Sequence, residues 1–214
     1  RGTLIALART VDANSPWTAG HSERVSALAV IIGRVLQLSP EDLDRLEVGG
    51  LLHDVGKVGV SPDILNKPGP LTDTEYAKVR AHTTLGASIL EPVRAYRDLI
   101  PLVRSHHELL DGSGYPDGLS GDQIPPLVRI MTVADIFDAL VSTRPYRDAL
   151  PLVEIMSLFR KGNGVKFDAD VLGVFLNMLG AGYADIWRLY PQLTEQLSHG
   201  VTSEDEALLI GRWT

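Results

Sequence analysis

The sequence predicts an all-α fold, a packed helical bundle. Apolar residues recur at steps of three and four along several segments, and helix-start signals stand before some of them. No run of residues alternates polar and apolar side chains as a half-buried strand does. The chain has 214 residues, of which 44% are hydrophobic, so a sizeable core is expected.

The first three expected helices lie in the N-terminal quarter of the chain. Residues 2–13 already form an apolar, helix-like stretch. Apolar residues at helical spacing over 25–36 predict one buried helix face. Ser39 and Pro40 are typical of a helix start, with a capping hydroxyl and a proline in the first turn, and this helix should run to about His53.

The later helices are separated by loops and turns. Thr72 and Glu75 form a capping box that should open a helix through about Leu90. Prolines and glycines rule out regular structure over much of 111–126. Further helices are expected over about 99–109, 127–141, 151–160 and 168–179.

We expect two parts in the chain, a domain over residues 1–180 and a C-terminal helical extension over 181–214. Ser203 and Glu206 have the spacing of a capped helix. Tyr190 is a large side chain that needs something to pack against.

The composition excludes several classes of partner and site. A formal net charge of −7 argues against binding to DNA or RNA polymers, which requires a basic face. Cysteine is absent, so any metal must be held by His, Asp and Glu. No stretch of about 18 apolar residues is present, so we expect no membrane contact by this segment and a cytoplasmic location. Because Arg1 falls within a helix-like stretch, we also expect a piece of a larger protein, which could carry membrane-anchoring or sensor segments.

The placement of the histidines points to a shared ligand. His21, His82 and the pair 106–107 lie three or four residues from a valine on the apolar face of an expected helix. One inward histidine alone is most often a core residue with a hydrogen-bond partner. Several of them leave many polar atoms to satisfy, and a metal cluster would do so, because neutral imidazole is a good ligand.

Two aspartates fit the same picture. Asp54 follows His53 directly, and Asp135 lies on an otherwise apolar helix. A buried carboxylate without a partner is costly, so a cation is expected nearby. Taken alone, Asp135 suits a surface position or an arginine salt bridge equally well.

Several short motifs occur in a characteristic order. They are "HD" at 53–54, "HHE" at 106–108 and "GYP" at 114–116, with "TAGHSERV", "LLHDVGKVGV", "ILNKPGPLT", "DGSGYPDGL", "VADIFDAL" and "STRPYRDAL" around them. Over about residues 12–148 the chain resembles the HD-GYP family, a branch of the HD-domain metal phosphohydrolases. The resemblance implies an all-α fold and hydrolysis of cyclic di-GMP to linear pGpG, and onward to GMP in some members.

The resemblance also implies roles for individual residues. Asp54 would bridge two metals, and Lys57 would act with it in catalysis by facing the scissile phosphate. Arg144 and Arg147 would contact the dinucleotide's phosphates, and Tyr115 would shape the substrate pocket. The implied metal ligands are His21, His53, Asp54, His82, His106, His107 and Asp135.

One departure from the family pattern bears on the number of metals. Some members hold three metals and carry a glutamate four residues before the first motif histidine. Trp17 occupies that position here and cannot bind a metal. We therefore predict two divalent ions, iron or manganese, with zinc, nickel and magnesium as alternatives.

Other interpretations stay open at this point. The substrate could be another cyclic dinucleotide such as 3′,3′-cyclic GMP-AMP, or the chain could be a non-catalytic sensor or partner-docking module. Lys57 and the two arginines also suit plain surface charge, and Tyr115 suits a core position. Glu108 could orient an imidazole or be exposed. As partners beyond the substrate we consider a homodimer and an upstream regulatory domain or GGDEF-type protein.

Overall fold

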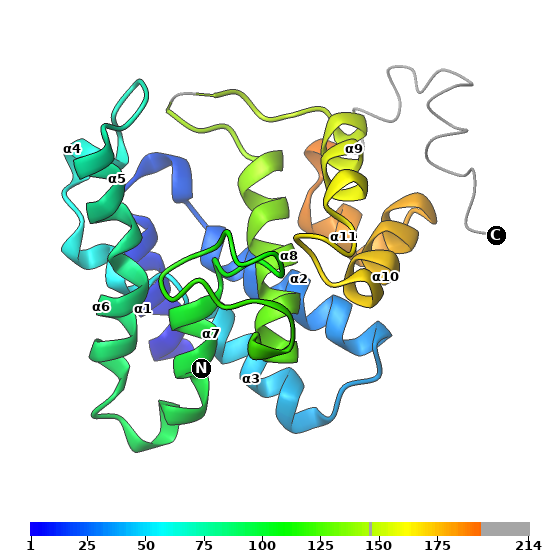
Figure 1. The fold of residues 1–214 in the computed structure, drawn as a ribbon, viewed down its shortest axis with the longest axis horizontal. Coiled ribbons are helices and arrows are strands. Elements are labelled where there is room, and N and C mark those ends of the chain that lie inside the picture. Colours follow the sequence, from blue (N-terminus) through cyan, green and yellow to red (C-terminus); the bar gives the residue numbers. More distant parts are fainter. Residues whose placement is uncertain (146, 194–214) are drawn as a thin grey trace.

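The structure, a computed structural model, describes residues 1–145 and 147–193 as helices joined by turns and short 3₁₀ segments (Figure 1). Within these residues the only β pairing is a set of isolated bridges, so the expected all-α fold is confirmed. The 3₁₀ segments are η1 (Pro16–Thr18), η2 (Val55–Gly59), η3 (Arg94–Leu99) and η4 (Gly121–Gln123). The α-helices are α1 (Gly2–Asp12), α2 (His21–Val35), α3 (Pro40–Leu52), α4 (Pro62–Leu65), α5 (Asp73–Arg80), α6 (His82–Leu90), α7 (Ile100–Ser105), α8 (Pro126–Val141), α9 (Leu152–Gly162), α10 (Ala169–Gly180) and α11 (Ala184–Leu189).

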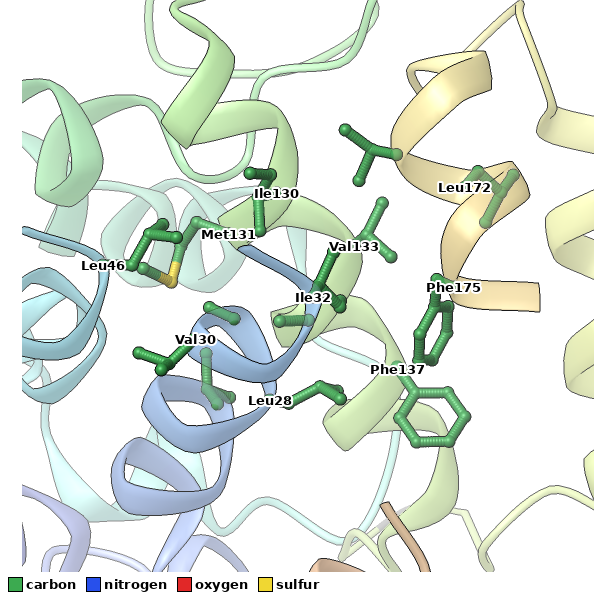
Figure 2. Packing of buried hydrophobic residues seen from close by; sticks show 14 of the residues in the cluster. Leu28, Val30, Ile32, Leu46, Ile130, Met131, Val133, Phe137, Leu172 and Phe175 are labelled. Carbon is green, nitrogen blue, oxygen red and sulfur yellow. The ribbon is translucent and has the colours of Figure 1, made fainter. Parts of the chain in front are cut away.

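Helices α2 and α8 form the centre of the molecule. Helix α2 packs against both α3 and α8, while α4, α5 and α6 lie to one side of α8 and α9 and α10 to the other (Figure 1). Figure 2 shows Leu28 and Ile32 of α2 facing Val133 and Phe137 of α8, and all four are fully buried. Burying each such side chain stabilises the fold by about 1.5–3 kcal/mol, so this pair of helices provides a rigid frame.

The predicted helix starts are present. The Ser39 hydroxyl accepts the backbone N–H of Asp42, which caps α3. The capping box of Thr72 and Glu75 opens α5, with both reciprocal bonds formed. Both caps satisfy backbone donors that the first turn of a helix leaves without partners.

Two expected helices are shorter than the sequence pattern suggested. The helix predicted from Thr72 to about Leu90 is interrupted at Ala81, which separates α5 from α6. The helix predicted over 99–109 begins as η3 and its α-helical part ends at Ser105. Beyond each interruption stands a histidine whose ring hydrogen-bonds a carbonyl three residues earlier, a local bond that competes with the regular helical ladder.

The described part of the C-terminal segment packs on the main bundle. Helix α11, which the sequence did not single out, lies against α2. Tyr190 is fully buried with its ring 5.2 Å from that of Phe137. The predicted capped helix near Ser203 lies outside the described residues, and the boundary at residue 180 stays a prediction. No described helix combines the length and apolarity needed to cross a bilayer.

Candidate metal centre

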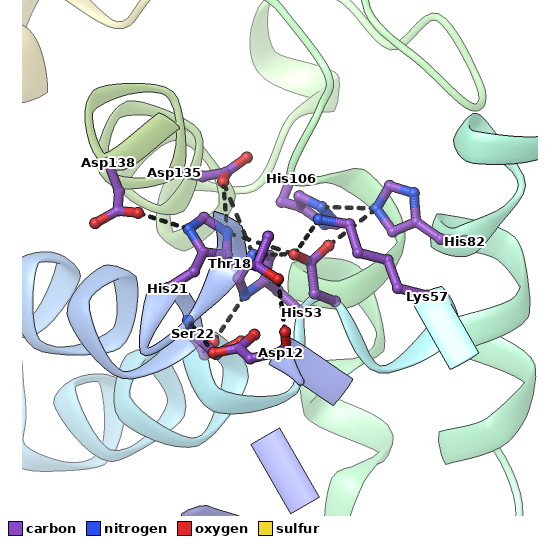
Figure 3. A network of polar contacts seen from close by, with 12 residues as sticks. Asp12, Thr18, His21, Ser22, His53, Lys57, His82, His106, Asp135 and Asp138 are labelled. Atoms are coloured by element: carbon purple, nitrogen blue, oxygen red, sulfur yellow. Dashed lines mark hydrogen bonds and ion pairs between the residues drawn. The ribbon is translucent and has the colours of Figure 1, made fainter. Parts of the chain in front are cut away.

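The seven residues predicted as metal ligands lie together. Figure 3 shows five of them, His21, His53, His82, His106 and Asp135, pointing toward one another. The seven residues come from α2, the end of α3, α6, the end of α7 and α8. Six of them are buried, and the His107 side chain keeps 23% of its surface exposed. Their ligand atoms form three overlapping sets, each within 4.8 Å: His21, His53 and Asp54; His53, His106 and Asp135; and His82, His106 and His107.

Three of the histidines are oriented in the same way. The Nδ1 atom of each lies 2.6–2.9 Å from the carbonyl oxygen three residues earlier, in the last turn of α3, α5 or α7. A carbonyl only accepts hydrogen bonds, so Nδ1 must carry the proton. In the neutral ring this leaves an unprotonated Nε2 facing the cluster. The residues are His53, His82 and His106.

This arrangement fits a bound cation. The Nε2 atoms of His82 and His106 lie 3.3 Å apart, where two lone pairs would repel each other unless a positive charge lay between them. His53 Nε2 and Asp54 Oδ1 are buried and make no hydrogen bond in the described part of the chain. Buried polar atoms without partners are rare and often mark an ion. The donor set of imidazole and carboxylate suits divalent iron, manganese or zinc.

His21 is oriented by a residue that the sequence interpretation missed. Its Nδ1 lies 2.7 Å from Asp138 Oδ2, and Asp138 is fully buried. The Arg24 guanidinium donates to both oxygens of the same carboxylate, at 2.6 and 3.0 Å. A carboxylate behind a histidine ligand fixes its ring and raises its basicity. The available signal was spacing, because Asp138 follows Asp135 by three residues and so shares a helix face with it.

The two aspartates in the cluster each face ligands on both sides. Asp54 Oδ2 lies 3.4 Å from Nε2 of both His21 and His53, while its Oδ1 lies 3.3 Å from His82 Nε2. Asp135 Oδ1 lies 3.3 Å from His21 Nε2, and its Oδ2 lies 3.5 Å from His107 Nδ1. Either carboxylate could therefore serve two neighbouring cations.

The electrostatics divide the cluster into neutral and charged groups. Burial lowers the pKa of His82, lowers that of His106 well below its usual value, and lowers that of His107 to about 3, so all three are neutral. Burial opposes ionisation of Asp54 and Asp135, but Lys57 for the first and the nearby histidines for both outweigh it and hold each pKa well below its usual value. Ionised carboxylates and neutral imidazoles are the forms that bind metals.

The surroundings of His21 favour a positive charge at its ring. Burial disfavours its imidazolium form, yet hydrogen bonds to Asp135, Asp138 and Asp54 raise its pKa well above the usual value. A proton or a metal ion could supply that charge at Nε2.

Lys57 reaches the cluster from η2, where its ammonium pairs with Asp54. Its side chain is 20% exposed, so it lies between the buried aspartate and solvent. Gly56 lets η2 lie close to the backbone of α6, because a Cβ atom at this position would lie 1.9 Å from the carbonyl oxygen of His82. Lys57 also lines a cavity of about 140 Å³ together with Trp17 and Arg144.

The loop that carries Tyr115 packs against the cluster. The Tyr115 ring lies 4.7 Å from that of His107. A Cβ atom on Gly114 would lie 2.5 Å from the backbone of residues 107–109, so only glycine allows this contact. Glu108 is buried and accepts the backbone N–H groups of residues 117, 118 and 119 at 2.7–3.1 Å. Glu108 is thus neither exposed nor an imidazole partner; it anchors the loop.

The two arginines predicted to bind phosphate have different surroundings. Arg144 lines the cavity beside Lys57. The Arg147 guanidinium donates to carbonyls of Ala139 and Leu140 in the last turn of α8, at 2.7 and 3.3 Å, and to its neighbour Asp148 at 2.7 Å. These bonds satisfy carbonyls that the helix end leaves free. A phosphate contact by Arg147 stays a prediction and would require some of these bonds to be exchanged.

Buried histidines and aspartates from separate helices come together in this bundle. Such an arrangement is typical of helical proteins that bind metal ions at a His/Asp centre. The comparison with family models places the chain more narrowly. The model described as "HD domain" matches residues 6–171. The chain belongs to the HD-domain family.

Named relatives agree with this assignment. The chain is 41% identical over 186 residues to 3′3′-cGAMP-specific phosphodiesterase 3 of Vibrio cholerae, covering 86% of this chain and 40% of the relative. It is 38% identical over 178 residues to a cyclic di-GMP phosphodiesterase of Pseudomonas aeruginosa, covering 83% of this chain and 42% of the relative. The chain thus spans well under two thirds of these relatives. A solved HDG"Y"P protein of Bdellovibrio bacteriovorus shares the fold, with a TM-score of 0.61 at 21% identity over 72% of this chain and 49% of that one.

Proposed function

We propose that the chain is a metal-dependent phosphodiesterase that hydrolyses cyclic di-GMP to linear pGpG, and in a further step to GMP. The observation that carries this is the buried cluster, in which unprotonated ring nitrogens face two ionised aspartates beside the cation Lys57. Relatives with names that specify cyclic-dinucleotide phosphodiesterases support the substrate class.

We infer that two divalent ions bind there, iron or manganese, with zinc, nickel and magnesium as alternatives. The two-sided placement of Asp54 and Asp135 supports a pair of ions. Trp17, which is 40% exposed, stands four residues before His21 and offers no donor for a third. When bound, such a pair polarises phosphoryl oxygens and lowers the pKa of water toward neutrality.

The chain's own residues would position the substrate around this centre. Lys57 places a compact positive charge at the solvent side of Asp54, where it can hold the scissile phosphate. Arg144 lines the same cavity as Lys57 and would meet the second phosphate with its forked donors. Tyr115 lies against His107 and would limit how the dinucleotide can enter.

A second candidate substrate is 3′,3′-cyclic GMP-AMP. The specific observation in its favour is that two relatives at 41% and 40% identity carry names specific to this dinucleotide. The phosphodiester chemistry at the cluster would be the same, and only contacts to the bases would distinguish the two substrates.

The proposal is tested by incubating the purified, metal-loaded chain with each dinucleotide and separating the products by chromatography. Wild type should consume cyclic di-GMP, while His53→Ala and Asp54→Ala should lose at least about a thousandfold in rate, because both disrupt the metal set. Circular dichroism should show that both variants keep their helical content. Tight binding of the dinucleotide with no product from the loaded wild type would instead indicate a sensor. A homodimer, a GGDEF-type partner and a cytoplasmic location stay predictions.

A further inference from the structure

We propose that Arg80 reads the edge of a guanine base and so sets the nucleobase specificity of this site. The inference rests on the proposed function, because it concerns how a cyclic dinucleotide would lie against the cluster. It adds a specificity-determining residue that the sequence motifs did not single out.

The first observation is the position of Arg80 beside the candidate site. It is the last residue of α5, and the carbon of its guanidinium lies 4.5 Å from the centre of the Tyr115 ring. That ring in turn lies 4.7 Å from His107, a member of the cluster. Arg80 is therefore one aromatic ring removed from the metal ligands.

The second observation is that Arg80 has no acidic partner among the residues that the structure describes. Within residues 1–145 and 147–193, its guanidinium forms no ion pair and no hydrogen bond, although the side chain is half-buried. Four other arginines near the centre are already paired: Arg24 with Asp138, Arg104 with Asp117, Arg129 with Asp168, and Arg147 with helix carbonyls. A half-buried guanidinium with free N–H groups next to a substrate site is available for an acceptor on the substrate.

The third observation is an exposed ring on the same helix face. Tyr76 lies one helical turn before Arg80, is 48% exposed, and has its ring 5.8 Å from the guanidinium carbon. A nucleobase can stack on such a ring. The base would then present its edge to Arg80, whose plane is held by the contact with Tyr115.

The hydrogen-bond donors of the Arg80 guanidinium favour guanine over adenine. Two parallel N–H donors match the O6 and N7 acceptors of guanine. Adenine offers N7 but places an N6 amino donor where the second acceptor should be, so one pair of donors would face each other. Cyclic di-GMP and 3′,3′-cyclic GMP-AMP each contain a guanine, whereas cyclic di-AMP contains none.

A base contact explains the position of Arg80 better than a phosphate contact. Lys57 already pairs with Asp54 inside the cluster and is the nearer cation for the reacting phosphate. The base of the same nucleotide lies farther out from phosphorus, which is where Arg80 stands relative to His107.

The experiment compares kcat and KM for cyclic di-GMP, 3′,3′-cyclic GMP-AMP and cyclic di-AMP in wild type, Arg80→Lys and Arg80→Ala. Bis(p-nitrophenyl) phosphate, which has no base, reports the metal centre separately. Lys78→Ala removes an exposed positive charge from the same helix and serves as the matched control. In both Arg80 variants kcat/KM should fall by about 10- to 100-fold for the two guanine-containing substrates, mainly through KM. Cyclic di-AMP, bis(p-nitrophenyl) phosphate and the Lys78 variant should be unaffected.

Three results would overturn the assignment. Equal losses on all three dinucleotides would indicate a phosphate contact, full rescue by Arg80→Lys would indicate charge alone, and unchanged kinetics would indicate no contact. Arg80→Lys keeps the charge and the stem over Tyr115, so it remains informative if Arg80→Ala is poorly folded. If wild type hydrolyses bis(p-nitrophenyl) phosphate but no dinucleotide, the proposed function itself fails. If wild type hydrolyses the dinucleotides and one of the three results above is found, only the assignment of Arg80 fails.

Discussion

At the scale of single residues, the same device orients three histidines of the cluster. Each stands just after the last turn of a helix and donates Nδ1–H to a carbonyl there. The helix end thus fixes the tautomer and turns Nε2 toward the centre, with no side-chain partner needed. No α-helix ends directly before His21, and there the Asp138 carboxylate takes the role of the carbonyl.

The role of Asp138 gives a residue-scale prediction. Asp138→Asn keeps the size of the side chain but removes the charge that accepts from His21 and Arg24. Metal affinity should fall by about 10- to 100-fold, measured by titration with Mn²⁺ or Fe²⁺ under anaerobic conditions. Glu23→Gln, which breaks only the exposed pair with Arg9, is the control and should bind metal as wild type does. Unchanged affinity in Asp138→Asn would show that His21 needs no orienting carboxylate.

Residue identity alone predicted some of these features and not others. The seven residues that the family resemblance implies as ligands do lie close together, and ordered motifs marked them in the sequence. Asp138 and Glu108 were not assigned their contacts, since these depend on which segment lies opposite in space. The same holds for Arg147, whose bonds to the end of α8 arise from a turn in the chain that its sequence does not specify.

At the scale of elements, the loop after α7 depends on one buried side chain. Glu108→Gln should leave some of the three N–H groups of residues 117–119 poorly satisfied, destabilising the fold by about 1–3 kcal/mol. The loop carries Tyr115, so KM for the dinucleotide should rise more than kcat falls. Urea unfolding and steady-state kinetics check both effects.

The matched control for Glu108→Gln is Asp117→Asn in the same loop. It breaks an exposed pair with Arg104 and should cost less than about 1 kcal/mol, with KM unchanged. Equal effects of the two substitutions would contradict an anchoring role for Glu108.

At this scale, the sequence pattern did not predict where a helix is interrupted. Apolar spacing continues across Ala81, so the pattern indicated one helix where the structure has α5 and α6. Periodicity reports which face is buried, and it carries little information about a local bond such as that from His82 to Val79.

At the scale of the whole molecule, the helical frame and the metal centre make separable contributions. The frame of α2, α8 and α10 is held by buried apolar side chains such as Leu28, Phe137 and Phe175. Chelation should therefore leave the far-UV circular dichroism nearly unchanged. Metal at a hundred times its Kd should add about 2.7 kcal/mol of stability. For a chain of this size that raises Tm by about 5–10 °C.

A His53→Ala variant is the control for this thermal shift and should respond much less to metal. Loss of the helical signal on chelation would show that the frame depends on the centre. An identical Tm with and without metal would show that the cluster binds none.

The central claim is that imidazoles and carboxylates from five segments hold metal ions inside the bundle. Anomalous scattering from crystals of the iron- or manganese-loaded chain tests it most directly. We predict two anomalous peaks within the cluster, with Asp54 between them and both ions in contact with ring nitrogens whose Nδ1 atoms face carbonyls or Asp138. A crystal in which these side chains are ordered but no anomalous peak lies among them would contradict the account.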